Sequence, residues 1–199
     1  MKDIGDDIKT HCSKRSDADV DVITRISNLI KGCQRVCDIG FGNTALAEML
    51  LKECPSIFYC GIDINGICVD EAKKKLSKGN IHFYTGEMTE IKLPQFDCFV
   101  ISRVIHHMTA TEIEATLRTV IYNLNGNGKL VIVDSIRDFS NRSNRYLYLP
   151  FYILTQTYKF LSSYELTCRC VGNAAINKYW AIVMDVSENR ASYLLEFID

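Results

Sequence analysis

The sequence lacks the features that mark membrane-spanning, exported and dedicated nucleic-acid-binding proteins. No apolar run among its 199 residues approaches the ~20 residues of a membrane-spanning helix. The N-terminal Met-Lys-Asp-Ile-Gly-Asp-Asp has none of the apolar character of a secretory signal. Lysine and arginine total 23 against 24 aspartates and glutamates, so the basic excess of a nucleic-acid binder is absent. We therefore expect a cytoplasmic protein without a transmembrane segment, for which binding to nucleic acid is disfavoured but not excluded.

The sequence also lacks internal repeats, a linker between domains and the cysteine spacing of a zinc site. Nine cysteines are present, most of them inside apolar runs, where a free thiol packs as a small hydrophobe. The pairs Cys33/Cys37 and Cys168/Cys170 do not have the spacing of zinc ligands. We expect reduced thiols, no bound metal, and a single domain over residues 1–199.

Short apolar runs alternate with segments of helical periodicity, which is typical of a parallel sheet covered by helices on both faces. Expected strands cover residues 35–39, 57–62, 81–84, 96–102, 129–134, 165–171 and 178–186. Expected helices cover residues 17–31, 44–53, 67–78, 109–124 and 188–197. The predicted fold is α/β: a Rossmann-like, doubly wound, seven-stranded and mostly parallel sheet with an antiparallel C-terminal hairpin strand. Residues 1–32 are expected to form an N-terminal helical segment.

The most informative segment is Asp38-Ile-Gly-Phe-Gly42, between the first expected strand and its helix. Its glycines let the backbone approach a ligand closely at the carboxyl end of the strand. The Asp38 carboxylate would repel a pyrophosphate, because two like charges ~5 Å apart cost about 3 kcal/mol at an effective dielectric constant of ~20. It would attract a cofactor that carries an ammonium and a sulfonium. The segment therefore favours S-adenosylmethionine (SAM) over a nicotinamide dinucleotide.

The order of motifs over residues 33–186 resembles the class I SAM-dependent methyltransferases, in particular those of the quinone-biosynthesis type that act on small molecules. In that family an acid and a glycine-rich turn follow the first strand, as Asp38, Gly40 and Gly42 do here. An acid that binds the ribose hydroxyls ends the second strand, as Asp63 does, and its distance from Gly40 fits the ~20-residue spacing of such an acid. Thr44 stands where the family usually has a third glycine.

The resemblance implies further contacts to the cofactor. Ile64 would pack on the adenine face, Glu87 and Met88 would lie near the adenine amino group, and Ser102 and Arg103 would flank the methionine end. The implied cofactor-binding residues are therefore Asp38, Gly40, Gly42, Asp63, Ile64, Glu87, Met88, Ser102 and Arg103.

Two histidines follow the fourth expected strand, in a segment similar to one that is common in methyltransferases of small molecules. His106 and His107 are our candidate catalytic residues, because an imidazole serves as a general base near neutral pH if the acceptor arrives protonated. A structural role for either is the alternative. The predicted function is transfer of a methyl group from SAM to a small aromatic or hydrophobic acceptor. An RNA methyltransferase and a non-catalytic, methyltransferase-like protein that binds a partner remain open.

Residues 136–163 are longer than a usual connection between elements and are rich in aromatic side chains. We interpret them as a substrate cap, because ligands of open α/β sheets bind beyond the carboxyl ends of the strands. Basic residues among the aromatic ones also suit RNA, and a helix packed on the sheet edge is the structural alternative. The aromatic residues are Phe139, Tyr146, Tyr148, Phe151, Tyr152, Tyr158 and Phe160, and the basic ones are Arg137, Arg142, Arg145 and Lys159.

Overall fold

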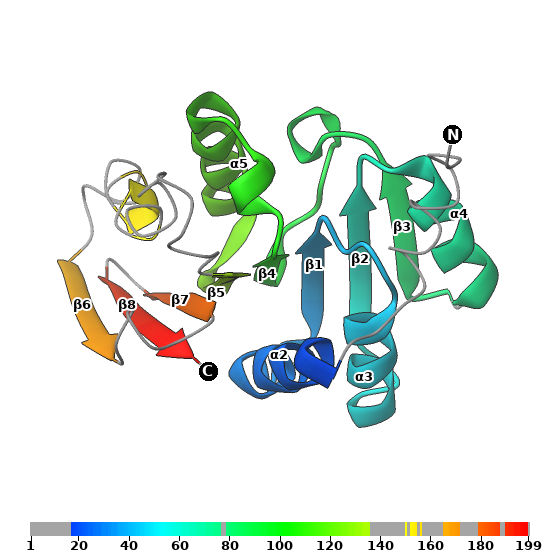
Figure 1. The fold of residues 1–199 in the computed structure, drawn as a ribbon, viewed down its shortest axis with the longest axis horizontal. Helices are drawn as coiled ribbons and strands as arrows, with labels where there is room; N and C mark the ends of the chain where they lie inside the picture. The colour runs from blue at the N-terminus through cyan, green and yellow to red at the C-terminus, as the bar shows by residue number, and fades with distance from the viewer. Residues whose placement is uncertain are drawn as a thin grey trace. The chain divides into compact units, whose positions relative to one another are not determined.

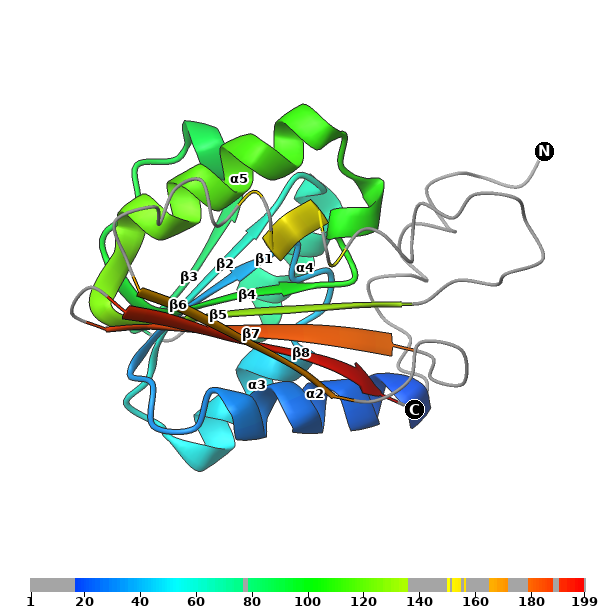
Figure 2. The ribbon, with the colours of Figure 1, turned by 90° about the vertical axis from the view of Figure 1, so that its left-hand side faces the viewer.

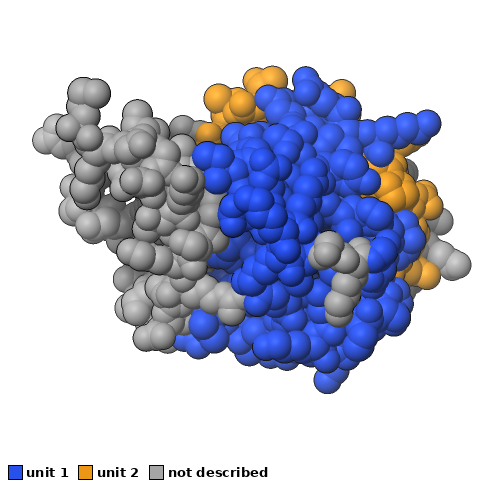
Figure 3. Space-filling view, turned by 90° about the vertical axis from the view of Figure 1, so that its right-hand side faces the viewer, with its two compact units in different colours: residues 1–92 blue, residues 93–199 orange. Residues whose placement is uncertain are grey.

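The computed structural model describes the backbone of residues 17–76, 79–135, 150, 152–154, 156, 165–171, 179–187 and 190–198. The chain divides into two compact units, Met1–Lys92 and Leu93–Asp199 (Figure 3). The expectation of a single domain stays a prediction. No helix in the described ranges combines the length and the apolar character needed to cross a membrane.

The first unit contains three parallel strands with β2 in the middle and β3 at the edge (Figure 1). The strands are β1 (Arg35–Ile39), β2 (Phe58–Asp63) and β3 (Ile81–Thr85). The helices are α2 (Asp17–Leu29), α3 (Ala45–Glu53) and α4 (Gly66–Lys75), and a 3-10 turn, η1, covers Met88–Glu90. The helix α2 packs on α3, and α4 packs on β2 and β3. These elements confirm the predicted order of strands and helices, with boundaries within three residues of expectation.

The register of the first unit brings the predicted cofactor segment together. Asp38 on β1 pairs with Gly61 on β2, and Ile39 pairs with Ile62, so both strands end at the same edge. Directly after β2, the Asn65 side chain accepts a hydrogen bond from the Ile67 backbone N–H and caps α4. The chain therefore turns sharply after Asp63, which leaves this carboxylate at the carboxyl end of the sheet.

The second unit begins with two parallel strands, β4 (Phe96–Ser102) and β5 (Leu124–Ser135). Between them lie the 3-10 turn η2 (Ile105–His107) and the helix α5 (Ala110–Asn123), which crosses one face of the strands (Figure 2). The expected capping box is confirmed, because the side chains of Thr109 and Glu112 each accept the other's backbone N–H. The turn expected at residues 125–128 is wrong, because β5 begins at Leu124 and includes these residues; the register jumps there from Phe96↔Leu124 to Cys98↔Lys129.

The C-terminal part of the second unit corrects two expectations. It contains β6 (Glu165–Val171), β7 (Tyr179–Ser187) and β8 (Arg190–Ile198). All seven expected strands are present, but the helix expected over 188–197 is wrong, because β8 occupies residues 190–198. The antiparallel hairpin is also formed by β7 and β8, whereas β6 pairs in parallel with β8. The antiparallel pairing of β7 with β5 confirms the mixed character of the C-terminal strands.

The described cysteines fit the interpretation as small hydrophobes in part. Cys37, Cys60 and Cys98 are free thiols buried in strands β1, β2 and β4, where they contribute to the core. Cys68 departs from the expectation of a fully reduced chain, because it is bonded in a disulfide.

Candidate functional site

At the carboxyl ends of β1 and β2, a backbone loop is hydrogen-bonded to a carboxylate. The Asp63 carboxylate accepts the Gly42 N–H on Oδ2 at 2.9 Å and the Asn65 N–H on Oδ1 at 2.8 Å. Gly40 donates its N–H to the Ile62 carbonyl at 2.7 Å. Both glycines have left-handed backbones, with φ of 67° at Gly40 and 56° at Gly42, which side chains other than glycine adopt at a cost. The loop and Asp63 therefore form one preorganised unit.

Asp38 lies just inside this loop and is 3% exposed. Its Oδ2 accepts a hydrogen bond from the Tyr59 hydroxyl at 2.7 Å. Burial raises the pKa of the Asp38 carboxyl to about 7, the hydrogen bond from Tyr59 lowers it, and the nearby Asp63 charge raises it. Burial and the adjacent Asp38 raise the pKa of Tyr59 well above its ordinary value, so the phenol stays protonated.

The remaining predicted cofactor residues of the first unit differ in accessibility. Ile64, directly after Asp63, is 77% exposed, so its side chain is accessible to a ligand. Glu87 is exposed, whereas Met88 is buried in η1. Thr44, at the position of the third glycine, is buried; it precedes α3, and its hydroxyl donates to the Glu48 carboxylate. A small hydroxyl side chain thus fits this position.

The second unit pairs one candidate histidine with a carboxylate. His106 Nδ1 lies 2.6 Å from Asp134 Oδ1, and the His106 backbone N–H donates to Asp134 Oδ2 at 3.1 Å. The side chains are 5% and 0% exposed. Because an ionised carboxylate only accepts hydrogen bonds, the contact assigns the proton to Nδ1 and leaves the lone pair of a neutral imidazole on Nε2. An imidazole held in one tautomer in this way is one that can act as a general base.

The residues around His106 differ in exposure and in backbone conformation. His107 is exposed, with its ring centroid 3.9 Å from that of His106. Ser102 ends β4 and is half-buried. Arg103 has a left-handed backbone with φ of 57°, held in place by a hydrogen bond from its N–H to the Val133 carbonyl at 2.8 Å. A non-glycine residue in this region is a recognised mark of strain at functional turns.

Two residues of these arrangements are absent from the sequence-based predictions. Asp134 was identified only as the end of an expected strand, and Tyr59 only as part of one. A signal for Asp134 was present, because it follows an apolar strand as Asp38 and Asp63 do. For Tyr59 the signal was weaker: a hydroxyl-bearing side chain in a strand that is otherwise buried.

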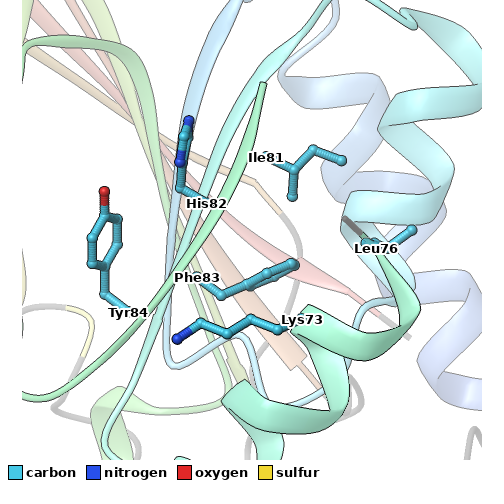
Figure 4. Close-up of a pocket in the computed structure, with 6 residues that line it drawn as sticks. All are labelled: Lys73, Leu76, Ile81, His82, Phe83 and Tyr84. Carbon is cyan, nitrogen blue, oxygen red and sulfur yellow. The ribbon is translucent and has the colours of Figure 1, made fainter. Parts of the chain in front are cut away.

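A depression of about 280 Å³ lies between α4 and the edge strand β3. It contains none of the predicted site residues, and its lining comprises Lys73, Leu76, Ile81, His82, Phe83 and Tyr84 (Figure 4). Of the expected cap, Tyr152 is described, and its hydroxyl donates to the Ala110 carbonyl at 3.5 Å. The other aromatic and basic residues of that expectation lie outside the described residues.

Comparison with known proteins gives a family match over most of the chain. The model of the O-methyltransferase domain family matches residues 10–159. Acetylserotonin O-methyltransferase of Bos taurus is 28% identical over 110 residues, which cover 54% of this chain and 32% of that protein. The human protein of the same name is 28% identical over 114 residues, with the same coverage of both chains. The chain therefore matches about a third of the length of these curated relatives.

Solved structures share the fold. Human N-acetylserotonin methyltransferase in complex with SAM superposes with a TM-score of 0.56 and 20% identity over 85% of this chain and 53% of that one. The N-methyltransferase NodS from Bradyrhizobium japonicum, in complex with S-adenosylhomocysteine (SAH), gives a TM-score of 0.62 and 14% identity over 77% and 84%. The likeness confirms the predicted α/β fold of methyltransferases.

Proposed function

The chain belongs to the O-methyltransferase domain family, and from this premise we propose that it transfers the methyl group of SAM to a hydroxyl of a small aromatic or hydrophobic molecule. The observation that carries the proposal is the buried His106–Asp134 pair, which is a general base in a fixed tautomer. Such a base is needed when the acceptor is a hydroxyl, whose proton must leave as the methyl group arrives. The acceptor in the names of the curated relatives is acetylserotonin, a molecule of this class.

The residues at the carboxyl edge of the first unit fit SAM. The Asp63 carboxylate is oriented by two backbone N–H groups and keeps lone pairs for the ribose hydroxyls. The exposed Ile64 offers an apolar face to adenine, and the left-handed Gly40 and Gly42 let the backbone approach the ligand. The Asp38 carboxylate matches the ammonium of the methionine portion. We also assign Ser102, Arg103, Glu87 and Met88 to cofactor binding, with Met88 buried in η1.

The reaction needs few groups from the protein. SAM supplies a methyl carbon bonded to a sulfonium, a leaving group that is already activated. His106 accepts the proton of the acceptor hydroxyl at Nε2, and Asp134 stabilises the imidazolium that results. Alignment of the acceptor oxygen with that methyl carbon would account for most of the remaining acceleration. The exposed His107 is the second candidate for the base.

Calorimetry with SAH tests the cofactor assignment. The wild-type chain should bind SAH, and Asp63→Ala should weaken binding at least about tenfold, since a carboxylate hydrogen-bonded to a ligand contributes about 1.5–3 kcal/mol. Asp70→Ala, which removes an exposed acid on α4, is the matched control and should bind as the wild type does. Absence of SAH binding by the wild type would contradict the proposal.

Turnover is tested by incubation with SAM and a panel that contains acetylserotonin and simple phenols, with methyl transfer detected by mass spectrometry. A methylated oxygen supports the proposed reaction. SAH binding without turnover on any acceptor would favour the non-catalytic alternative, and transfer to RNA alone would favour the RNA methyltransferase.

A further inference from the structure

An aromatic cluster explains why Asp38 is buried. Its register partner Gly61 has no side chain, and the rings of Phe41 and Phe83 lie 2.9 and 2.8 Å from the position that a Cβ at Gly61 would take. These two rings are 5.0 Å apart, and the Tyr59 ring lies 5.9 Å from that of Phe83. Paired residues of a parallel ladder share a face, so the cluster and Asp38 lie on the same face of the sheet. The carboxylate is thereby largely shielded from water.

Tyr59 is the polar member of this cluster. It is 0% exposed, and in the parallel register it pairs with Val36, two residues before Asp38. From there its hydroxyl reaches along the strand to Asp38 Oδ2. A carboxylate has a second oxygen, so this contact fixes the plane of the group and still allows a ligand to bind.

The groups around Asp38 determine its charge. Tyr59 favours the ionised form by donating to it, whereas burial and the Asp63 charge disfavour that form. Burial and the adjacent Asp38 keep the proton on Tyr59. Asp38 is therefore close to half ionised near neutral pH, and its pKa of about 7 rests on a balance in which one hydroxyl opposes burial.

We propose that Tyr59 is a positioning residue for cofactor binding: its hydroxyl orients Asp38 and favours the ionised form that receives the SAM ammonium, so the fraction of Asp38 that is still protonated in the free protein loses its proton on binding. The inference rests on the proposed function, in which Asp38 receives that ammonium. The step is balanced, because the neutral carboxyl loses its proton to solvent as the ligand's cation takes its place.

Calorimetry with SAH between pH 6 and 8 tests this inference, because SAH carries the same ammonium. The affinity of the wild type should rise with pH through about 7, and at pH 6.5 the heat should depend on the ionisation enthalpy of the buffer, which reports the released proton. Tyr59→Phe removes the hydroxyl and retains the ring. It should bind SAH about threefold to tenfold more weakly at pH 7, with the rise displaced to higher pH.

Tyr84→Phe is the matched control, because it makes the same change on the opposite face of the sheet. Figure 4 shows Tyr84 and His82 on one side of β3 and Phe83 on the side of α4. The Tyr84 ring stacks on His82 and is 43% exposed, so its variant should bind SAH as the wild type does at every pH.

The outcomes separate the inference from the proposed function. If a folded Tyr59→Phe variant bound SAH with the same affinity and pH dependence as the wild type, the inference would be overturned. The proposed function would still stand, because SAH binds. If Tyr59→Phe does not fold, the wild type alone decides: heats at pH 6.5 that are independent of the buffer would overturn the inference. Failure of the wild type to bind SAH at any pH would instead overturn the proposed function.

Discussion

Two buried carboxylates, one in each unit, occupy similar positions with different partners. Asp38 is the penultimate residue of β1 and Asp134 the penultimate residue of β5, and they are 3% and 0% exposed. Asp38 accepts a hydrogen bond from the Tyr59 phenol at 2.7 Å, whereas Asp134 contacts the His106 imidazole at 2.6 Å. A phenol stays neutral at ordinary pH, whereas an imidazole becomes cationic when it accepts a proton. The two sites therefore differ in where a positive charge comes from.

This difference assigns a separate task to each carboxylate. The described groups that act most strongly on Asp38 are Tyr59 and Asp63, neither of which is a cation; in the proposed function the ammonium of SAM supplies the matching charge. In the proposed function, Asp134 faces a side chain, His106, that becomes cationic when it takes a proton from the acceptor. The first arrangement suits the binding of a cation, and the second suits the stabilisation of one that forms during the reaction.

The largest effect is expected at the histidine. His106→Ala should lower kcat by about 10²- to 10⁴-fold, the usual contribution of a general base, and leave SAH affinity unchanged. His107→Ala should have a much smaller effect, because that side chain is exposed, whereas the His106 side chain is buried against Asp134. The measurement is methyl transfer to the best acceptor of the panel, with calorimetry on the same samples. A larger loss of kcat in His107→Ala than in His106→Ala would indicate that His107 is the general base.

A double substitution tests whether Asp134 acts through His106. Asp134→Asn should lower kcat by at least about tenfold and alter the pH profile, because an amide does not fix the tautomer or stabilise the imidazolium. In a His106→Ala background the same change should cost little more, since residues that act as a unit are not additive. Thermal melts of each variant report folding. Additive losses in kcat would indicate that Asp134 has an independent role.

The next prediction concerns the stability of the protein rather than its activity, and it applies to Asp38 alone of the two carboxylates. The Asp38 carboxyl has a pKa of about 7 in the folded state against 3.8 in a model peptide, so its folded form retains a proton that the unfolded chain loses. Its contribution to stability is present below pH 4 and is lost as the pH rises to 7. Relative to the wild type, Asp38→Asn should therefore become more stable as the pH rises from 4 to 8. The difference in the free energy of unfolding, measured with urea, should reach on the order of 2–4 kcal/mol. The same variant should bind SAH weakly, and a constant difference in stability across pH would contradict the assigned pKa.

The positions of the individual acids were predictable from the sequence, but their partners were not. Asp38 and Asp63 are recognisable because apolar runs, glycines and acids follow one another within a few residues. The contacts Tyr59–Asp38 and His106–Asp134 join residues 21 and 28 positions apart, and they depend on the register of β1 with β2 and of β4 with β5. Register follows from the packing of whole strands, which local patterns do not specify.

The C-terminal correction has the same physical origin. Residues 188–197 contain apolar residues at spacings compatible with either a helix or a strand, so periodicity alone does not decide between them. The antiparallel ladder from Ser187↔Arg190 to Tyr179↔Ile198 decides it, because every backbone position of β8 finds a partner on β7. The pairing also explains why β6 adds to the outer side of β8 instead of forming the expected hairpin.

The turns that follow β1 and β4 extend the comparison to the backbone. Gly42 has φ of 56° and open space around the position of a Cβ. Gly42→Ala should therefore destabilise the protein by about 1–2 kcal/mol through its backbone conformation alone. Gly79→Ala is the matched control, with equally open space and no left-handed φ, and should change stability little. Equal effects of the two changes on urea unfolding would contradict this explanation.

Arg103, in the corresponding turn after β4, has φ of 57° without the freedom of a glycine. Arg103→Gly should relieve this strain, and because the unfolded chain also gains freedom, the net stabilisation should be at most about 1 kcal/mol. Arg103→Ala keeps the strain and removes the guanidinium. The difference in stability between the two variants therefore measures the cost of the left-handed backbone at this position. A loss of SAH affinity that is equal in both variants measures the contribution of the Arg103 side chain to binding. A protein that retains strain at Arg103 while using glycine at Gly42 is expected to need that side chain, so unchanged SAH affinity and kcat in both variants would remove Arg103 from the site.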